Sequence, residues 1–313
     1  MFFFATVPTL SGAVPAPSGS PGPRRPRLSR DVRAPYRRRR TAARGKAAGG
    51  ARGRARGRRR RTGAASGEVA VETGSGGPVP VPVPVTGGAT VAVAARRLGS
   101  GASAGYGDAV FDTASIVKVG ILAALLLRAQ DAGRRLTARE RTYAAAMIGH
   151  SDNDAASALW RVIGGADGLD AANERFGLKE TTGGDGPLWG LTRTTAADQL
   201  VLLRQVFGGA GAERSELGEA SRTYVRRLMG RIAPGQDWGV SAAADGSGWA
   251  LKNGWLPRGT TGLWVVNSIG RVTAGGDDYL VAALSSGNRT KEQGIALVEA
   301  AARAAVSACG RTA

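Results

Sequence analysis

The sequence predicts an α+β fold, in which a helical region is inserted into one antiparallel sheet. Strand patterns occur near residues 89–106 and again between residues 248 and 287, with helical patterns filling the chain between them. The late strands follow one another closely, as antiparallel neighbours do. A helical pattern ends the chain, so we expect about five strands flanked by terminal helices, with an inserted all-helical region.

The elements follow in a clear order. A first strand is expected over residues 89–95, and a glycine turn at 99–101 leads to a second strand over 102–106. Apolar residues at helical spacing then predict helices over 114–131, 137–148, 152–163, 168–176, 195–207 and 217–232. Three apolar stretches bounded by Gly or Asn predict strands over 248–254, 261–270 and 278–287, and a final helix is expected over 290–308.

The N-terminal part of the chain differs in composition from the rest. Residues 1–75 are rich in Arg, Gly, Ala and Pro and lack apolar periodicity, which predicts a disordered tail. Residues 24–61 carry a net charge of +17, whereas the rest of the chain carries +2. The basic composition of the tail is consistent with non-specific binding of RNA or another polyanion. The alternative is a solvated extension without a partner. The Val-Pro repeat in 76–85 predicts a stiff spacer, and 86–313 is expected to form one domain.

Scarce residue types exclude several kinds of site. The single cysteine, Cys309, forbids an internal disulfide, and we expect it to be a small buried hydrophobe. The single histidine, His150, forbids a multi-histidine metal site and reads as a cap or loop residue. The longest apolar run, 119–127, is shorter than the ~20 residues of a membrane span. The first residues lack the positive start of a signal peptide, so the compartment stays open.

One predicted helix contains a lysine at a position where its apolar pattern predicts a buried residue. In "TASIVKVGILAALLL" (113–127), Lys118 interrupts an apolar run one turn after Ser115. Positions i and i+3 share a helix face, so the Ser115 hydroxyl and the Lys118 ammonium are expected to meet. Burial lowers the pKa of a lysine, which suits Lys118 as the base for a serine nucleophile. The alternative is a capping serine with a lysine that extends to solvent.

Two further motifs carry polar groups. Ser151-Asp152-Asn153 lies between two predicted helices, where Ser151 or Asp152 can also serve simply as a helix cap. Lys252-Asn253-Gly254 lies on a predicted strand. There, Lys252 either protects a sheet edge from pairing or directs a positive charge into a cleft.

Together, the three motifs resemble those of the serine β-lactamase and penicillin-binding protein superfamily, which carries SxxK, SDN and KTG. The chain has SIVK at 115–118, SDN at 151–153 and KNG at 252–254, in that order. The resemblance covers residues 86–313 and is strongest to actinobacterial class A β-lactamase-related serine hydrolases. The resemblance implies a β-lactamase/transpeptidase-like fold. Proteins of this superfamily act outside the cytoplasmic membrane, so the resemblance also implies an extracytoplasmic location.

The resemblance also implies roles for individual residues. Ser115 would be the acylated nucleophile, Lys118 its base, and Ser151 the group that passes a proton to the leaving atom. The oxyanion hole would use the backbone N–H groups of Ser115 and Trp255. Substrate binding would involve Asn153, Lys252, Asn253, Gly254 and Trp255. No metal or organic cofactor is implied, the substrate would be a small molecule or peptide, and the protein would be a monomer.

The chain departs from the family at two places. The region 178–195 lacks the E-x-x-L-N pattern that supplies the deacylating glutamate, and Glu180 and Asp185 are weak replacements. Asn253 stands where the family has Thr or Ser, and Trp255 follows the motif. We therefore expect an SxxK serine hydrolase of an amide, ester or β-lactam, with weak or no true β-lactamase activity. The alternatives are a non-catalytic protein that binds a cell-wall peptide or partner, and a polyanion binder acting through the tail.

Four further tryptophans are expected to be core or rim residues, namely Trp160, Trp189, Trp238 and Trp264.

Overall fold

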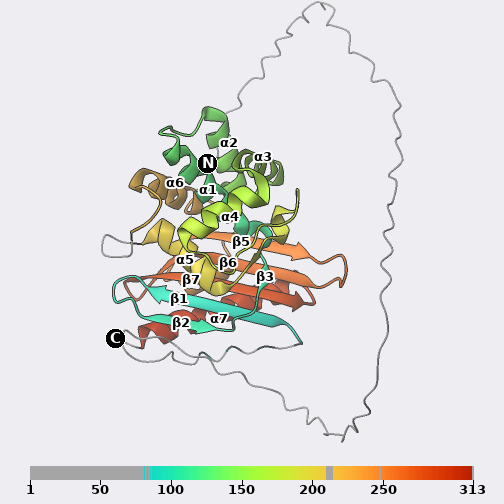
Figure 1. Cartoon of the computed structure of the whole chain (residues 1–313). Coiled ribbons are helices and arrows are strands. Elements are labelled where there is room, and N and C mark those ends of the chain that lie inside the picture. The colour runs from blue at the N-terminus through green and yellow to red at the C-terminus, as the bar shows by residue number, and fades with distance from the viewer. Residues whose placement is uncertain are drawn as a thin grey trace, which may run out of the picture. The chain divides into compact units, whose positions relative to one another are not determined.

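The computed structural model describes residues 81, 83, 85, 87–208, 214–246 and 248–311. The predicted disordered tail, 1–75, lies outside these residues. Within them, a five-stranded sheet lies between a layer of helices and one C-terminal helix (Figure 1). The predicted α+β architecture, with strands at both ends of the chain and helices inserted between them, is confirmed.

The sheet is antiparallel and has the order β2-β1-β7-β6-β5. β1 pairs with β7 through partners such as Val93 and Ala283, which joins the start of the domain to its end. β5 occupies one edge, so one side of its backbone is free to face another part of the molecule. The strands are β1 (Thr90–Arg97), β2 (Ser103–Tyr106), β5 (Trp249–Pro257), β6 (Trp264–Ala274) and β7 (Asp277–Asn288).

Some of the inserted helices begin at side-chain caps that the sequence supplies. Thr137 and Glu140 form a reciprocal capping box at the second helix, and Asp152 accepts a hydrogen bond from the backbone at the third. A short ribbon of β3 (Phe111–Asp112) and β4 (Arg193–Thr194) was not predicted, because two-residue strands have no periodicity to detect. The helices are α1 (Val117–Asp131), α2 (Ala138–Gly149), α3 (Asn153–Ile163), α4 (Gly165–Phe176), α5 (Ala196–Phe207) and α6 (Glu219–Met229).

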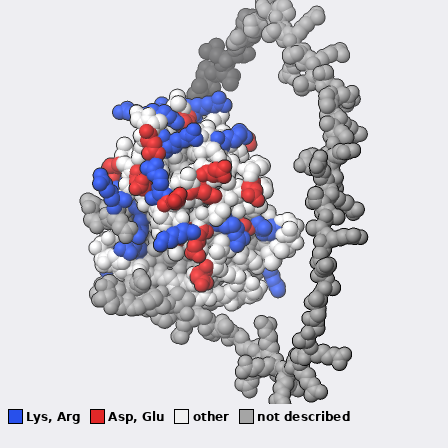
Figure 2. Space-filling view, in the orientation of Figure 1, with Lys and Arg blue, Asp and Glu red and all other residues white. Residues whose placement is uncertain are grey.

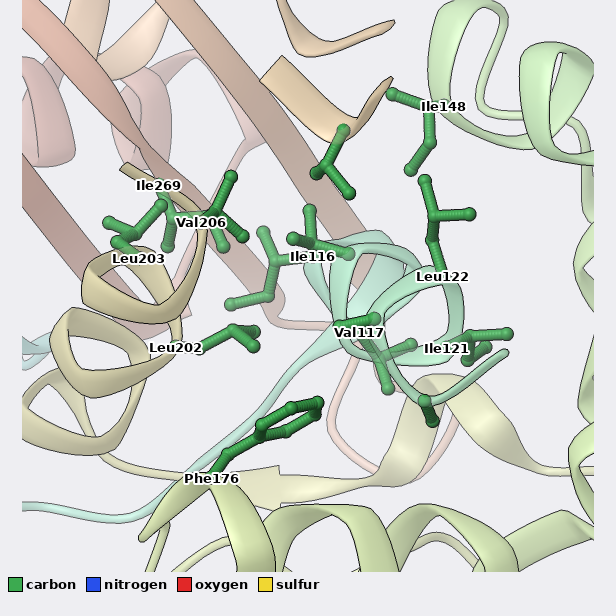
Figure 3. Close-up of a cluster of buried hydrophobic side chains, with 14 of the residues drawn as sticks. Ile116, Val117, Ile121, Leu122, Ile148, Phe176, Leu202, Leu203, Val206 and Ile269 are labelled. Carbon is green, nitrogen blue, oxygen red and sulfur yellow. The ribbon is translucent and has the colours of Figure 1, made fainter. Parts of the chain in front are cut away.

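Both faces of the sheet are buried. On β7, Leu280, Ala282 and Leu284 join the core beneath the inserted helices, and the residues between them join a second core beneath α7 (Lys291–Gly310). Cys309 is fully buried there, as expected, and burial raises the pKa of its thiol to about 11. The first core surrounds α1, where the labelled side chains of Figure 3 meet, among them Ile116, Ile121, Phe176, Leu202 and Ile269.

Two residues of the Val-Pro segment belong to the second core. Val81 and Val83 are buried among residues of the sheet and α7, so this segment contributes side chains to packing. On the surface shown in Figure 2, acidic and basic side chains are interspersed, in keeping with the near-neutral charge of the sequence outside 24–61. Among the helices described, none combines the length and apolarity needed to cross a bilayer.

Candidate active site

Ser115 lies in a tight, half-buried turn. A 3₁₀ turn (Ala114–Ile116) links β3 to α1, so Ser115 immediately precedes the N-terminus of α1, as predicted. Ala114 has a positive φ of 47°, an unusual backbone conformation for a residue other than glycine. The buried amide of Asn267 supports the turn, because its Nδ2 donates hydrogen bonds to the carbonyls of Asp112 (2.9 Å) and Thr113 (3.0 Å). A side chain of the central sheet therefore positions the turn that carries Ser115.

Gly254 lets the edge strand β5 lie directly against this turn. A Cβ atom at position 254 would lie 2.7 Å from the backbone nitrogen of Ser115, 2.8 Å from that of Ile116 and 2.8 Å from the carbonyl oxygen of Thr113. These distances are shorter than any normal contact, and all three partners are backbone atoms. The third motif therefore contains glycine for close packing, and its role is to bring β5 next to Ser115.

Two buried lysines meet at the hydroxyl of Ser151. Lys118 Nζ donates hydrogen bonds to the Ser151 carbonyl (2.6 Å), Ser151 Oγ (3.2 Å) and Asn153 Oδ1 (2.8 Å). From the other side, Lys252 Nζ donates to Ser151 Oγ (3.1 Å) and to the Asn253 carbonyl (2.7 Å). Both lysine side chains are completely buried. The three sequence motifs thus converge on one cluster, although they are far apart along the chain.

Burial changes the charge state of both lysines. It lowers the pKa of Lys118 to about 8, and the charge of Asp152 opposes this shift. Burial, together with the nearby charge of Lys118, lowers the pKa of Lys252 to about 7. The direction expected for Lys118 is confirmed. Both ammonium groups therefore lose a proton more readily than exposed lysines do.

The expected direct contact between Ser115 Oγ and Lys118 Nζ does not form a hydrogen bond. Among the described residues, the Lys118 ammonium donates only to Ser151 and Asn153. Three acceptors match its three N–H groups, which leaves none for Ser115 while Lys118 is charged. A neutral Lys118 would instead have a lone pair for the Ser115 proton.

Two predicted substrate-binding side chains point away from Ser115. Alternate residues of a strand face opposite sides, so Lys252 and Gly254 face the helices, while Asn253 and Trp255 face α7. Asn253 is 1% exposed, and both protons of its Nδ2 are used by the carbonyls of Gln236 (2.7 Å) and Trp238 (2.9 Å). Its amide therefore cannot replace the family's hydroxyl as a donor to substrate, and it anchors a loop instead.

The Trp255 ring is also directed away from the nucleophile. It packs 5.8 Å from the Trp238 ring, and Lys291 Nζ lies 4.3 Å from its centroid. The ring therefore belongs to a cluster on the α7 side of the sheet. Only the backbone of Trp255, which follows Gly254 on the edge strand, lies next to the Ser115 turn. His150 is exposed and caps the end of α2, as expected.

The position of Trp189 beside Lys118 was not predicted from the sequence, which indicated a core or rim residue. The Trp189 ring centroid lies 4.8 Å from Lys118 Nζ, and its Nε1 donates a hydrogen bond to Ser157 Oγ (3.1 Å). Glu180 and Asp185, in the same connection between α4 and α5, are exposed. In the part of the chain described, neither carboxylate bonds to Lys118, Ser115 or Ser151. An indole ring therefore occupies the position beside Lys118, and no sequence signal marked it.

Comparison with known proteins places this site in a family. A family model described as the β-lactamase enzyme family matches residues 127–309, more than half of the chain. The chain belongs to the β-lactamase enzyme family. Ser151, Asn153 and Lys252 lie inside the matched range, and Ser115 and Lys118 precede it. Family membership supports a serine hydrolase in general, and no curated protein matches the sequence.

Solved structures agree on the fold. The structure of PBP-A is 24% identical, covers 74% of this chain and 93% of its own, and superposes with a TM-score of 0.61. A class A β-lactamase from Mycobacterium abscessus is 21% identical, with coverages of 71% and 95% and a TM-score of 0.59. A β-lactamase from Burkholderia phymatum is 20% identical, with coverages of 72% and 94% and a TM-score of 0.58. These likenesses confirm the predicted β-lactamase/transpeptidase-like fold.

Proposed function

We propose that this protein is an SxxK serine hydrolase that forms an acyl-enzyme on Ser115 with an amide, ester or β-lactam. The observation that carries the proposal is the hydroxyl of Ser151 held between two buried lysines, beside the turn that bears Ser115. Burial of the two lysines also lowers their pKa values towards neutrality, as a proton acceptor for Ser115 requires. The resemblance to actinobacterial members, the domain boundaries and an extracytoplasmic location stay predictions.

The reaction would begin with Lys118 in its neutral form. Lys118 takes the proton of Ser115 as Oγ attacks the carbonyl carbon, and the backbone N–H groups of Ser115 and Trp255 stabilise the oxyanion. Ser151 then donates its proton to the leaving nitrogen or oxygen, and a protonated lysine restores it. Asn153 orients Lys118 and binds the substrate amide. Water later hydrolyses the ester on Ser115 and completes the cycle.

Intact-mass spectrometry tests the acylation step. Incubation with a penicillin is expected to add the mass of the whole penicillin, because the ring opens without loss of atoms. A fluorophosphonate should label the same residue, and Ser115→Ala should give no adduct with either probe. Absence of an adduct on the wild type, or an equal adduct on Ser115→Ala, would overturn the proposal. A ligand that binds equally well to Ser115→Ala, without turnover by the wild type, would instead indicate a non-catalytic binding protein.

Gly254→Ala provides a geometric test of the site. The added methyl group meets three backbone atoms at 2.7–2.8 Å, so either β5 or the Ser115 turn must move. A displacement of about 1 Å at a reacting group costs about a hundredfold in rate, so acylation should fall by about that factor. Gly259→Ala is the matched control, because no atom lies within 4 Å of the added Cβ. Equal acylation rates for the two variants would contradict the proposed contact between β5 and the nucleophile.

A further inference from the structure

A crevice beside the candidate active site has no role in the proposed reaction. It has a volume of about 340 Å³ and is lined by three side chains of α3, the glycines that follow α3, and the loop before η2 (Trp189–Leu191). The volume falls within the range of small-molecule sites. The crevice shares Trp189 with the active site, because the ring of this residue also lies over Lys118. The lining residues are Ser157, Trp160, Arg161, Gly164, Gly165, Gly186, Pro187 and Trp189.

The two tryptophans make the walls apolar and hold them in place. Trp160 Nε1 donates to the Gly186 carbonyl (2.8 Å), and Trp189 Nε1 donates to Ser157 Oγ (3.1 Å). Each of these bonds ties the loop to α3. Since both indole N–H groups are already used, the rings have only carbon surfaces to offer a ligand. Flat apolar walls of this kind suit a planar apolar group.

Glycines keep one side of the crevice open. Gly164 and Gly165 have φ values of 99° and 70°, which the other amino acids rarely adopt. A Cβ atom on Gly165 would lie 3.7 Å from Trp160 Nε1, against the indole that forms the wall. The tight junction between α3 and α4 therefore requires glycine for its backbone and, as a consequence, leaves space beside Trp160.

Arg161 adds a charge to the crevice. Its side chain is exposed, and within the described residues no carboxylate forms an ion pair with it. Other arginines of this helical region do have such partners, for example Arg134 with Glu140 and Arg175 with Asp131. An unpaired guanidinium beside apolar walls offers a bidentate donor to a carboxylate.

We propose that this crevice binds a planar apolar group that carries a carboxylate, and that its occupancy acts on Lys118 through Trp189. Each part of the ligand matches a feature of the walls: the ring packs against the indoles, and the carboxylate pairs with Arg161. The same chemistry can come from a free aryl carboxylate or from the side chain of the acylating substrate. The binding step stands independently, and only its effect on acylation rests on the proposed function.

The direct test uses phenylacetate as the probe, measured by isothermal titration calorimetry or ligand-observed NMR. Wild type and Ser115→Ala should bind it equally, because Ser115 does not line the crevice. Arg161→Gln should weaken binding about tenfold, which corresponds to about 1.4 kcal/mol. Arg135→Gln should bind like the wild type, since Arg135 is also exposed but does not line the crevice. Benzylamine has the same shape but the opposite charge, so it should not bind.

Acylation by two penicillins then distinguishes the sources of the ligand. If the substrate's own side chain fills the crevice, phenylacetate competes with acylation, and Arg161→Gln loses a preference for α-carboxybenzyl over benzyl side chains. If a free ligand fills it, phenylacetate changes the acylation rate without competing. No binding of phenylacetate to the wild type, or equal binding by Arg161→Gln, would overturn the proposal. These results would leave the Ser115 adduct unaffected, so failure here is distinct from failure of the proposed function.

Discussion

Replacing Lys118 with methionine is expected to slow acylation of Ser115 by about 10²–10⁴-fold, the usual contribution of a general base. Methionine has a similar length and suits the apolar surroundings of α1, so the fold should survive the change. The measurement is the rate of adduct formation with a penicillin, followed by intact mass. An acylation rate within a few-fold of the wild type would remove Lys118 from the mechanism.

The same substitution has a second expected effect, on stability. Burial lowers the pKa of Lys118 from 10.5 to about 8, so between these values the unfolded chain binds more protons than the folded protein does. The free energy of unfolding of the wild type therefore rises with pH over this window. In total, the contribution of Lys118 to this rise is about 3 kcal/mol. Lys118→Met lacks it, so its stability relative to wild type should fall as pH rises from 8 to 10.5.

Urea unfolding at several pH values measures this difference directly. Groups remote from the site titrate in both proteins and largely cancel in the comparison. Lys252 does not cancel completely, because the charge of Lys118 contributes to its lowered pKa, and Lys118→Met removes that contribution. Lys179→Met is a suitable control, because the side chain of Lys179 is exposed and keeps its hydration in the folded state. A pH-independent difference between Lys118→Met and wild type would show that Lys118 is not held in a desolvated site.

These two effects explain why a lysine interrupts the apolar run of α1. A charged group in this position costs stability at neutral pH, and the cost itself is what moves the pKa into the range where the amine can accept a proton. The sequence revealed this much because the interruption is local: a single ammonium lies within an otherwise apolar helix. Ser115 was placed near it for the same reason, since the two residues are three positions apart, but their side chains do not form the expected hydrogen bond.

The orientation of residues across the sheet was harder to predict. The strand containing Lys252, Asn253 and Gly254 was recognised, and the family resemblance implied that the three motifs form one site. The side of the strand on which each residue faces depends on the register of β5 against β6, and on what packs behind it. Asn253 was read as a substrate contact because of its position in the motif. Tertiary packing instead gives its amide two backbone carbonyls, a demand that appears nowhere in the local sequence.

The position of Trp189 beside Lys118 could not be predicted from the sequence for a related reason. Its ring reaches Lys118 because the connection between α4 and α5 folds back across α3, and the pairing of Thr182 with Arg193 closes that loop. No periodic pattern encodes such a path. A tryptophan is also most often a core residue, so its identity alone gave no reason to place it in the site.

Trp189→Glu is expected to convert a long-lived acyl-enzyme into one that turns over. In the wild type, the carboxylates of this connection are exposed, and an indole lies beside Lys118 where a water-activating base would be useful. A glutamate introduced there could accept a proton from water, with Lys118 as a neighbouring positive charge. General-base catalysis is worth about 10²–10⁴-fold, so the lifetime of the penicilloyl adduct should shorten by a factor in that range.

Trp189→Gln is the control that separates chemistry from access. Both substitutions remove the indole, break the hydrogen bond to Ser157 and open the same space to water, but only glutamate supplies a base. The adduct on Ser115 would be followed by intact mass after excess penicillin is removed. Fast deacylation in Trp189→Glu with slow deacylation in Trp189→Gln would identify the missing base as the limiting factor. Equal acceleration in both variants would instead show that the indole protects the ester by excluding water, and the wild type would then be limited by hydration of the site.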